Sequence, residues 1–449
     1  MLTAPTLRTF WLVAASGAAL TAYLGYSVPQ GDFTGLAVGY LPLFLVYVFA
    51  LRSDSAATHW RWYLGLGIAL RLLLVFAPPL LSDDVYRFIW DGRLLAAGLN
   101  PFDQLPGYYL EAGHTVPGLT PALYAALNSP EYFTIYPPAA QAVFAFAVWL
   151  FPGSITGSTL VMKGVLFLAE VGTLLLLPRL FARWNLPPGR VLIYALNPLI
   201  ILEITGNLHF EGLMVFFLAL AFWLLARQRL YLAATAFAGA VIAKLLPVLF
   251  LPFLWRRLGT RRAWTFYLLA GGLVALSFLP LLSGVFLANF GDSLDLYFRK
   301  FEFNAGVYTL IRWIGYQVKG YNIIGSLGPA LALCTVAGIT ILAFAEKRPA
   351  LPDWPRACLW AICIYLLFTT TVHPWYVSLP VFLCAFTRYR FPVLWSGLIM
   401  LTYLQYAGGG FRELPWIMAL EYSAVIGYAG WELRAGQRPR SAPNRTERI

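Results

Sequence analysis

The sequence predicts an all-α, polytopic integral membrane protein with about 12–14 transmembrane helices. Of its 449 residues, 60% are apolar and only 12% are charged, whereas ordinary soluble domains have about 25% charged residues. A soluble chain could not bury so much apolar surface, so lipid must be one of its solvents. The 16 Trp and 25 Tyr residues are typical of bilayer edges, where amphipathic rings concentrate.

Apolar stretches long enough for helical spans recur along the whole chain. We expect spans near 9–26, 36–51, 60–80, 137–152, 160–178, 189–204, 209–226, 230–255, 263–284, 322–345, 356–371, 375–387, 391–407 and 415–433. Segment 230–255 has basic residues at both ends, so we expect a helical hairpin with Lys244 near its tip. Segment 9–26 has no small-residue cleavage site after it and is expected to be a retained span.

Basic loops predict the orientation of the spans, because cytoplasmic loops carry an excess of Lys and Arg. We expect one transmembrane domain over 1–433 and a basic cytoplasmic tail over 434–449, in the cytoplasmic membrane. The extracytoplasmic side then receives 81–136, 204–209, 285–321, 371–375 and 407–415. Three arginines do not fit this count, namely Arg179, Arg183 and Arg190. Either 137–152 does not cross the membrane fully or one of the span boundaries is wrong.

The distribution of charge argues against a nucleic-acid-binding protein, and the cysteine spacing argues against a disulfide framework or a cysteine metal site. The net charge of +12 comes from short loops and the tail rather than from a basic stripe interleaved with aromatics, so we expect no nucleic-acid partner. The cysteines lie in apolar stretches without disulfide or metal-ligand spacing, and packing is their expected role; they are Cys334, Cys358, Cys363 and Cys384.

The large first outer loop, 81–136, is rich in acidic and aromatic residues. Long loops outside regular structure are often functional. Within it, 83–97 has the pattern of an amphipathic helix lying on the membrane surface, ending at Gly98. Its apolar residues include Phe88, and its polar face carries Asp84, Arg87 and Asp91.

Ionisable and amide side chains converge on the outer side of the predicted topology. Ionisable residues in or beside hydrocarbon are functional candidates, and a shared cavity would explain why they choose one side. The set comprises Asp83, Asp84, Arg87, Glu203, Asn207, His209, Glu211, Lys244, Arg299, Lys300, Glu302, Asn304 and His373.

Each candidate also has a structural interpretation. An aspartate of the Asp83–Asp84 pair is a good helix N-cap, and Glu203 and His209 could satisfy each other as a buried pair. Lys244 either extends toward water or has an anionic partner. His373 could be a turn residue, and Arg299 and Lys300 could be plain loop charges.

The run SDDVYRFIWDGRLLAAGLNPF at 82–102 resembles the first outer loop of GT-C superfamily glycosyltransferases. It is most similar to bacterial glycosyltransferase family 87 and the polyprenyl-phosphomannose-dependent mannosyltransferases, and also to the GPI mannosyltransferase I family. Softer matches are IYPPAAQ at 135–141, NPLIILEITGNLHFEGLM at 197–214, AKLLPVLFLPFL at 243–254 and HPWY at 373–376.

The resemblance implies an inverting membrane enzyme that transfers a hexose, mannose by family, from a polyprenyl-phosphate donor to a lipid or glycan acceptor. The catalytic aspartate falls on Asp84 or Asp83, with Asp84 favoured. The two aspartates are adjacent rather than spaced as in the GPI family, so we expect no metal, and we expect no cofactor.

The residue types suit this chemistry. A carboxylate near the acceptor hydroxyl can take its proton, and cations can stabilise a departing lipid phosphate. For the phosphate we expect Lys244, Arg299, Lys300, His373 and Arg87. For the sugar and acceptor pocket we expect Glu203, Asn207, His209, Glu211 and Tyr376.

Two other functions remain open from the sequence. A flippase or transporter of lipid-linked saccharide would place its site near the bilayer midplane, within repeats, and no repeat is evident. A surface-polysaccharide polymerase is also multi-span, and its main outer loop is expected later in the chain.

Overall fold

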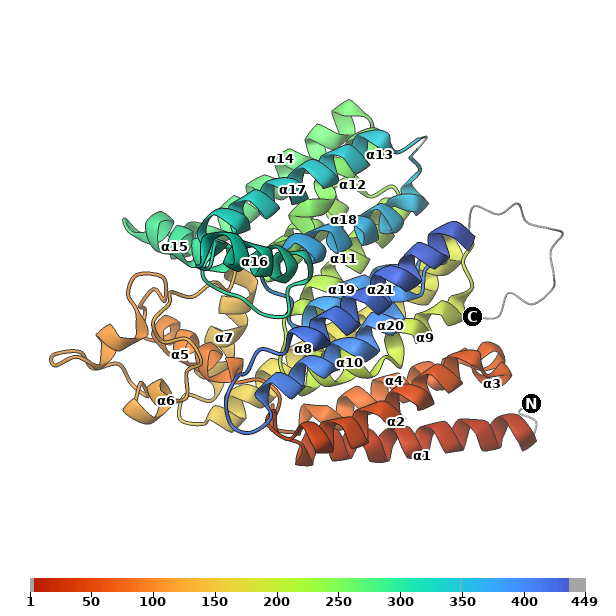
Figure 1. Cartoon of the computed structure of the whole chain (residues 1–449), viewed down its shortest axis with the longest axis horizontal. Helices are drawn as coiled ribbons and strands as arrows, with labels where there is room; N and C mark the ends of the chain where they lie inside the picture. The colour runs from red at the N-terminus through yellow and green to blue at the C-terminus, as the bar shows by residue number, and fades with distance from the viewer. Residues whose placement is uncertain (1–3, 348, 436–449) are drawn as a thin grey trace.

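A computed structural model describes residues 4–347 and 349–435, and its regular structure there is helical (Figure 1). The predicted all-α membrane fold is confirmed. The only pairing of extended backbone in these residues is one isolated bridge between Phe303 and Thr371. The predicted tail 434–449 lies outside the described residues from 436 onward.

In the part of the chain that the structure describes, five helices are long and apolar enough to cross a membrane, and a pair bent by 55° adds a sixth if it forms one span. The five are α1 (Ala4–Ser27), α2 (Phe33–Arg52), α8 (Ile155–Arg183), α14 (Thr260–Phe278) and α17 (Ile324–Ala345). The bent pair joins η2 (Pro188–Val191) and α9 (Leu192–Ala195) to α10 (Pro198–Ile200) and the π-helix η3 (Ile201–Gly206).

The remaining helices are shorter. They are α3 (Asp54–Thr58), α4 (Trp60–Val75), α5 (Asp84–Ala96), η1 (Pro106–Leu110), α6 (Pro121–Ala125), α7 (Pro138–Leu150), α11 (Glu211–Ala226), α12 (Leu230–Ala243), η4 (Leu246–Phe253), α13 (Leu254–Leu258), η5 (Leu279–Leu281), α15 (Phe286–Arg299), α16 (Gly306–Lys319), η6 (Leu351–Asp353), α18 (Trp354–Phe368), η7 (Pro374–Val377), α19 (Ser378–Cys384), α20 (Phe391–Leu398), η8 (Ile399–Tyr406) and α21 (Pro415–Ala435).

Each apolar segment expected from the sequence contains a helix, yet many of these helices are too short to count as spans by length. Proline is the main reason, because it removes a helical hydrogen bond and clashes with the preceding turn. Pro198 begins α10 after the break from α9, Pro247 is the second residue of η4 after α12, and Pro374 begins η7 before α19. The chain therefore divides several expected spans into helical pieces.

The basic loops gather at one end of the molecule, near the two ends of the described chain (Figure 1). Arg262 donates to Gln228 at 3.0 Å, so both ends of segment 230–255 meet there and the predicted hairpin is confirmed. Arg183 donates to the carbonyl of Ala226, and Arg190 donates to that of Thr387. These two arginines therefore join the other basic loops.

The short helix α7 explains why Arg179, Arg183 and Arg190 did not fit the predicted orientation of the spans. This helix is only 13 residues long, about 20 Å at 1.5 Å per residue, and it packs on α5 at the end of the molecule away from the basic loops (Figure 1). The α8 helix then runs 29 residues to the basic end. The helix in segment 137–152 is therefore shorter than the hydrocarbon core of a bilayer.

Helix α5 matches the expected helix 83–97 closely, and it stops before Gly98, whose φ is +75°. The expected exposed polar face was wrong, because Asp91 is fully buried and forms an ion pair with Arg87 at 2.9 Å. Close packing against α7 explains this burial. A Cβ at Gly92 would lie 2.6 Å from the carbonyl oxygen of Phe144, so α5 needs glycine there.

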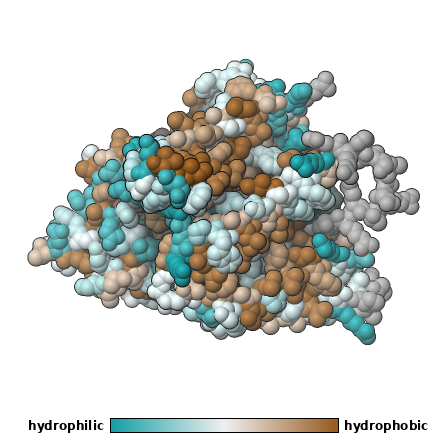
Figure 2. All heavy atoms as spheres, viewed as in Figure 1, coloured by the Kyte–Doolittle hydropathy of each residue, from teal (hydrophilic) through white to brown (hydrophobic). Residues whose placement is uncertain are grey.

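Hydrophobic residues form a broad area across the middle of the face in Figure 2, and hydrophilic residues are more frequent toward its left and right ends. That distribution fits a bilayer around the middle of the bundle. The packing role expected for the cysteines holds for Cys358 and Cys384, which are buried; Cys334 is instead exposed on α17.

Candidate active site

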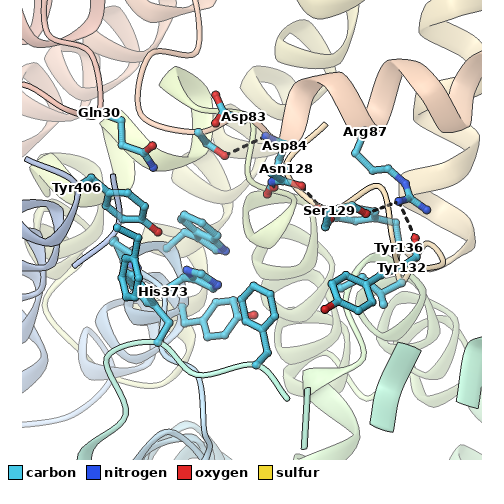
Figure 3. Close-up of a pocket in the computed structure, with 18 of the residues that line it drawn as sticks. Gln30, Asp83, Asp84, Arg87, Asn128, Ser129, Tyr132, Tyr136, His373 and Tyr406 are labelled. Carbon is cyan, nitrogen blue, oxygen red and sulfur yellow. Dashed lines mark hydrogen bonds between the residues drawn. The ribbon is translucent and has the colours of Figure 1, made fainter. Parts of the chain in front are cut away.

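A cavity of ≈ 380 Å³ opens at the end of the molecule opposite the basic loops. The start of α5 and the 128–136 segment form one side, and the turn before η7, the end of η8 and segment 301–303 form the other (Figure 3). Several predicted residues line it together: Asp83, Asp84, Arg87, Lys244, His373 and Tyr376.

The two aspartates at the start of α5 have different environments. Asp83 occupies the N-cap position, but its side chain makes no capping hydrogen bond. The Asp84 carboxylate accepts a 2.8 Å hydrogen bond from Asn128 (Figure 3). Burial, followed by the charge of Asp84, raises the pKa of Asp83 above its usual range. The site therefore holds two carboxyl groups, of which Asp84 is fixed in position.

Behind Asp84 lies a buried pair, Glu203 and His209. The His209 Nδ1 atom is 3.2 Å from the Glu203 carboxylate, and its Nε2 atom is 4.0 Å from Asp84 Oδ2. Tyr403 donates to the same Glu203 carboxylate at 2.8 Å. The buried pair expected as a structural alternative is thus present, and it lies next to Asp84 rather than on the cavity wall.

Asn207 has a backbone role in the structure. Its amide oxygen accepts from the Leu81 N–H at 3.0 Å, and its amide nitrogen donates to the Leu202 carbonyl at 3.0 Å. Asn207 does not line the cavity, so the expected place in the sugar pocket is not supported. Instead it fastens the start of the outer loop to the π-helix η3.

Lys244 reaches the cavity because the chain leaves helical geometry at that residue, with φ −157° and ψ 134°. Its ammonium lies 2.8 Å from the carboxylate of Glu211 and 5.5 Å from the ring centre of Tyr376. Glu211 is fully buried, whereas one fifth of the Lys244 side chain is exposed. The anionic partner is therefore present, and Lys244 still faces the cavity.

A stack of rings forms one wall of the site. The Trp375 ring lies between the rings of His209 and His373, with ring centres 3.6 Å and 4.5 Å away. The Phe303 ring stacks on His373, with 4.7 Å between the ring centres. Burial, with smaller contributions from His209 and Lys244, lowers the pKa of His373 to about 3. His373 is therefore neutral at physiological pH and offers an apolar face and a hydrogen bond rather than a cation.

Arg87 lines the cavity, but its guanidinium is already engaged. Its Nε donates to Asp91 and its Nη1 donates to the carbonyls of Ser129 and Tyr132 (Figure 3). Asp91 also accepts from Thr134. Arg87 therefore holds the 128–134 segment over α5, which places Asn128 beside Asp84.

Arg299 and Lys300 do not line the cavity, so the expectation that they hold the donor phosphate was not supported. Arg299 forms a 2.7 Å ion pair with Asp295 one turn earlier, and about half of each side chain is exposed. Arg299 is the last residue of the amphipathic helix α15 and Lys300 follows it, in a segment that was predicted to be a loop. The alternative reading as plain surface charges fits them better.

Several residues that line the cavity were not predicted from the sequence. Gln30, Asn128, Tyr406 and Phe411 line the cavity, and no spacing or charge pattern distinguishes them from ordinary loop residues. Within the described residues, no group of three or more His, Cys, Asp or Glu side chains is arranged to hold a metal ion.

Comparisons with known proteins identify a family of similar chains. A profile of the family described as alpha-(1->6)-mannopyranosyltransferase, N-terminal domain, matches residues 12–258. Alpha-(1->6)-mannopyranosyltransferase A of Mycobacterium tuberculosis is 25% identical over 342 residues, which are 70% of this chain and 62% of the relative. A second mannopyranosyltransferase of that organism, Rv1459c, is 28% identical over 152 residues, 32% of this chain and 24% of the relative. The chain thus matches less than two thirds of the length of these relatives.

Proposed function

This chain belongs to the alpha-(1->6)-mannopyranosyltransferase family, and we propose that it transfers mannose from a polyprenyl-phosphate donor to a lipid or glycan acceptor. The reaction takes place at the extracytoplasmic face of the cytoplasmic membrane. The observation that carries the proposal is the meeting of a carboxylate, Asp84, and a cation, Lys244, in one aromatic-walled cavity.

Asp84 is the general base of this proposal. The acceptor oxygen attacks the anomeric carbon, its O–H bond breaks, and Asp84 receives the proton. The bond from the anomeric carbon to the phosphate oxygen breaks in the same displacement, which inverts the configuration. The hydrogen bond from Asn128 holds one Asp84 oxygen and leaves the other available, at the cavity wall.

Lys244 stabilises the departing phosphate. Among the described residues that line the cavity, the cationic side chains are Lys244 and Arg87, and Arg87 is engaged with Asp91 and two carbonyls. A fixed cation aimed at a leaving phosphate lowers the barrier because the charge there grows in the transition state. Glu211 orients Lys244 through their 2.8 Å ion pair.

An apolar groove of ≈ 240 Å³ supports a polyprenyl donor. It runs between α2 and the α20–η8 segment and is lined by Phe33, Leu36, Ala37, Tyr40, Leu41, Phe44, Leu394, Gly397, Leu398, Met400 and Leu401. Gln30, just before α2, and Tyr406, at the end of η8, line the cavity. The groove therefore starts beside the cavity, and an isoprenoid tail in it would place its phosphate near the cavity mouth.

The experiment is transfer of radiolabelled mannose by the purified protein in lipid nanodiscs. Polyprenyl-phosphomannose and GDP-mannose are compared as donors, with a mannose oligosaccharide as acceptor. We expect product only with the lipid donor, a loss of at least about 100-fold in Asp84→Asn, and retention of most activity in Asp83→Asn. Transfer from GDP-mannose alone, or full activity in Asp84→Asn, would contradict the proposal.

A further inference from the structure

His209 is placed to act on Asp84 from behind the cavity. Only 2% of the residue is exposed, and it is absent from the cavity lining. Its Nε2 atom has no hydrogen-bond partner among the described residues and lies 4.0 Å from Asp84 Oδ2. A buried polar atom without a partner is costly, so this atom needs an explanation beyond packing.

The protonated nitrogen of His209 follows from its neighbours. Nδ1 is 2.8 Å from the backbone carbonyl oxygen of Glu203 and 3.2 Å from the Glu203 carboxylate, and both are hydrogen-bond acceptors. Nδ1 must therefore carry the hydrogen. In the neutral imidazole, Nε2 is then an acceptor, and it faces the carboxylate of Asp84, which is also an acceptor when ionised.

Two acceptors that face each other are stabilised by one proton between them. The pair Asp84 and His209 is therefore arranged to take up one proton during the reaction. Sugar transfer releases one proton from the acceptor hydroxyl, and Asp84 is the group that meets it.

The position of the imidazole is fixed on every side. Trp375 stacks on it at 3.6 Å with 14° between the ring planes, and Tyr403 holds the Glu203 carboxylate. The preceding residue, Leu208, has a φ of +66°, which is rare for a residue other than glycine. Strained backbone of this kind persists where the surrounding structure enforces it, and it concentrates at functional sites.

We propose that His209 is a positioning residue that orients Asp84 and accepts the proton that Asp84 takes from the acceptor. The inference rests on the proposed transferase function. The balance is simple: the acceptor O–H bond breaks, Asp84 gains the proton, and the proton moves to His209 Nε2, which forms an imidazolium. Glu203 stabilises that imidazolium through Nδ1, and Asp84 is again ionised. The proton later returns from Nε2 to Asp84, which lines the cavity, and leaves from there to water.

Several other charged groups face this pair and share its pH dependence. Glu203 contacts Nδ1, Asp83 adjoins Asp84, and Trp375 separates His209 from His373. Lys244 acts on His373 across the cavity. The test therefore compares variants of His209 that differ in one nitrogen position and leave these groups intact.

Two substitutions test the roles of the two ring nitrogens of His209 separately. In His209→Asn the amide replaces Nδ1 and keeps the contact with Glu203, but nothing replaces Nε2. In His209→Gln the amide reaches the Nε2 position and can orient Asp84, but it cannot accept a proton. His59→Asn is the matched control, because His59 lies between α3 and α4, near the basic loops.

Transfer is measured against pH, with lipid donor and acceptor varied separately. We expect kcat to fall about 10- to 100-fold in His209→Asn, less in His209→Gln, and not in His59→Asn, while KM for the donor stays within about twofold. Both His209 variants should differ from the wild type in the shape of the kcat profile against pH, because neither side chain can accept the proton from Asp84.

The inference fails if His209→Asn keeps the wild-type pH profile, even with a lower kcat, because a structural role alone gives that result. It also fails if kcat per folded protein is unchanged. Absence of transfer by the wild-type protein would instead contradict the proposed function, so the two failures are distinguishable.

Discussion

Lys244 and Glu211 form an ion pair of 2.8 Å in which the carboxylate is fully buried and the ammonium reaches the cavity. Loss of Lys244 would leave a buried carboxylate without its cation, which costs about 3–5 kcal/mol in comparable pairs. We therefore expect Lys244→Gln to lower both the melting temperature and the rate of transfer. Thermal unfolding and radiolabelled transfer measure the two effects.

A double substitution separates the effect on stability from the effect on the rate of transfer. Lys244→Gln combined with Glu211→Gln removes both charges, so stability should return toward the wild type. Activity should remain about 100-fold or more below it, because no cation then faces the departing phosphate. Recovery of transfer in the double variant would show that Lys244 has only a structural role.

The raised pKa of Asp83 predicts a pH-dependent stability change. A carboxyl group whose pKa is raised by folding binds its proton more tightly in the folded state, so it stabilises the protein at low pH and loses this contribution as the pH rises. Asp83→Asn should therefore raise the melting temperature at pH 7, by about 1 °C because the group is only partly buried.

The difference should vanish near pH 4, where aspartate takes up its proton in the unfolded chain as well. Tryptophan fluorescence during heating measures the melting temperature, and Glu111→Gln in the exposed outer loop is the control. A lower melting temperature for Asp83→Asn at pH 7 would contradict the raised pKa of Asp83, which burial and the charge of Asp84 cause.

The apolar groove predicts a dependence on the length of the lipid chain. Ala37 lines the groove, whereas Val38 on the same helix does not line it and is 62% exposed. Ala37→Trp should raise KM about tenfold for a long-chain donor, a loss of about 1.4 kcal/mol, and leave a short-chain donor unaffected. Val38→Trp should change neither. Equal effects on both donors would place the lipid tail elsewhere.

The grouping of basic loops predicts which ends of the molecule face the two sides of the membrane. In a background without the exposed Cys334, Glu111→Cys in the outer loop should react with a membrane-impermeant maleimide added outside intact cells. Arg229→Cys, beside Gln228 at the basic end, should react only after the membrane is opened. Labelling of both from the same side would contradict the proposed orientation.

The broad arrangement of helices and loops could be predicted from the sequence, because charge and hydropathy act over whole segments. The hairpin around Lys244 followed from basic residues at both of its ends, and helix 83–97 followed from its amphipathic period and Gly98. The meeting of Asp84 and Lys244 could be expected for the same reason, since buried charges gather where water and a ligand are available.

The details that the sequence left open depend on contacts that form only in the folded chain. The engagement of Arg87 requires Asp91 and the carbonyl of Tyr132, which lie 4 and 45 residues further along the chain. Arg299 looked available because its partner Asp295 becomes its neighbour only on a helix. Asn128 carries no signal at all, because its role comes from the fold of the 128–134 segment.

The most direct test is a structure of the protein with polyprenyl phosphate bound. We predict that the phosphate lies within about 4 Å of Lys244 Nζ, the separation expected of an ion pair, with the isoprenoid chain in the groove between α2 and α20. Phosphate held instead at the end of α15, beside Arg299 and Lys300, would contradict the account.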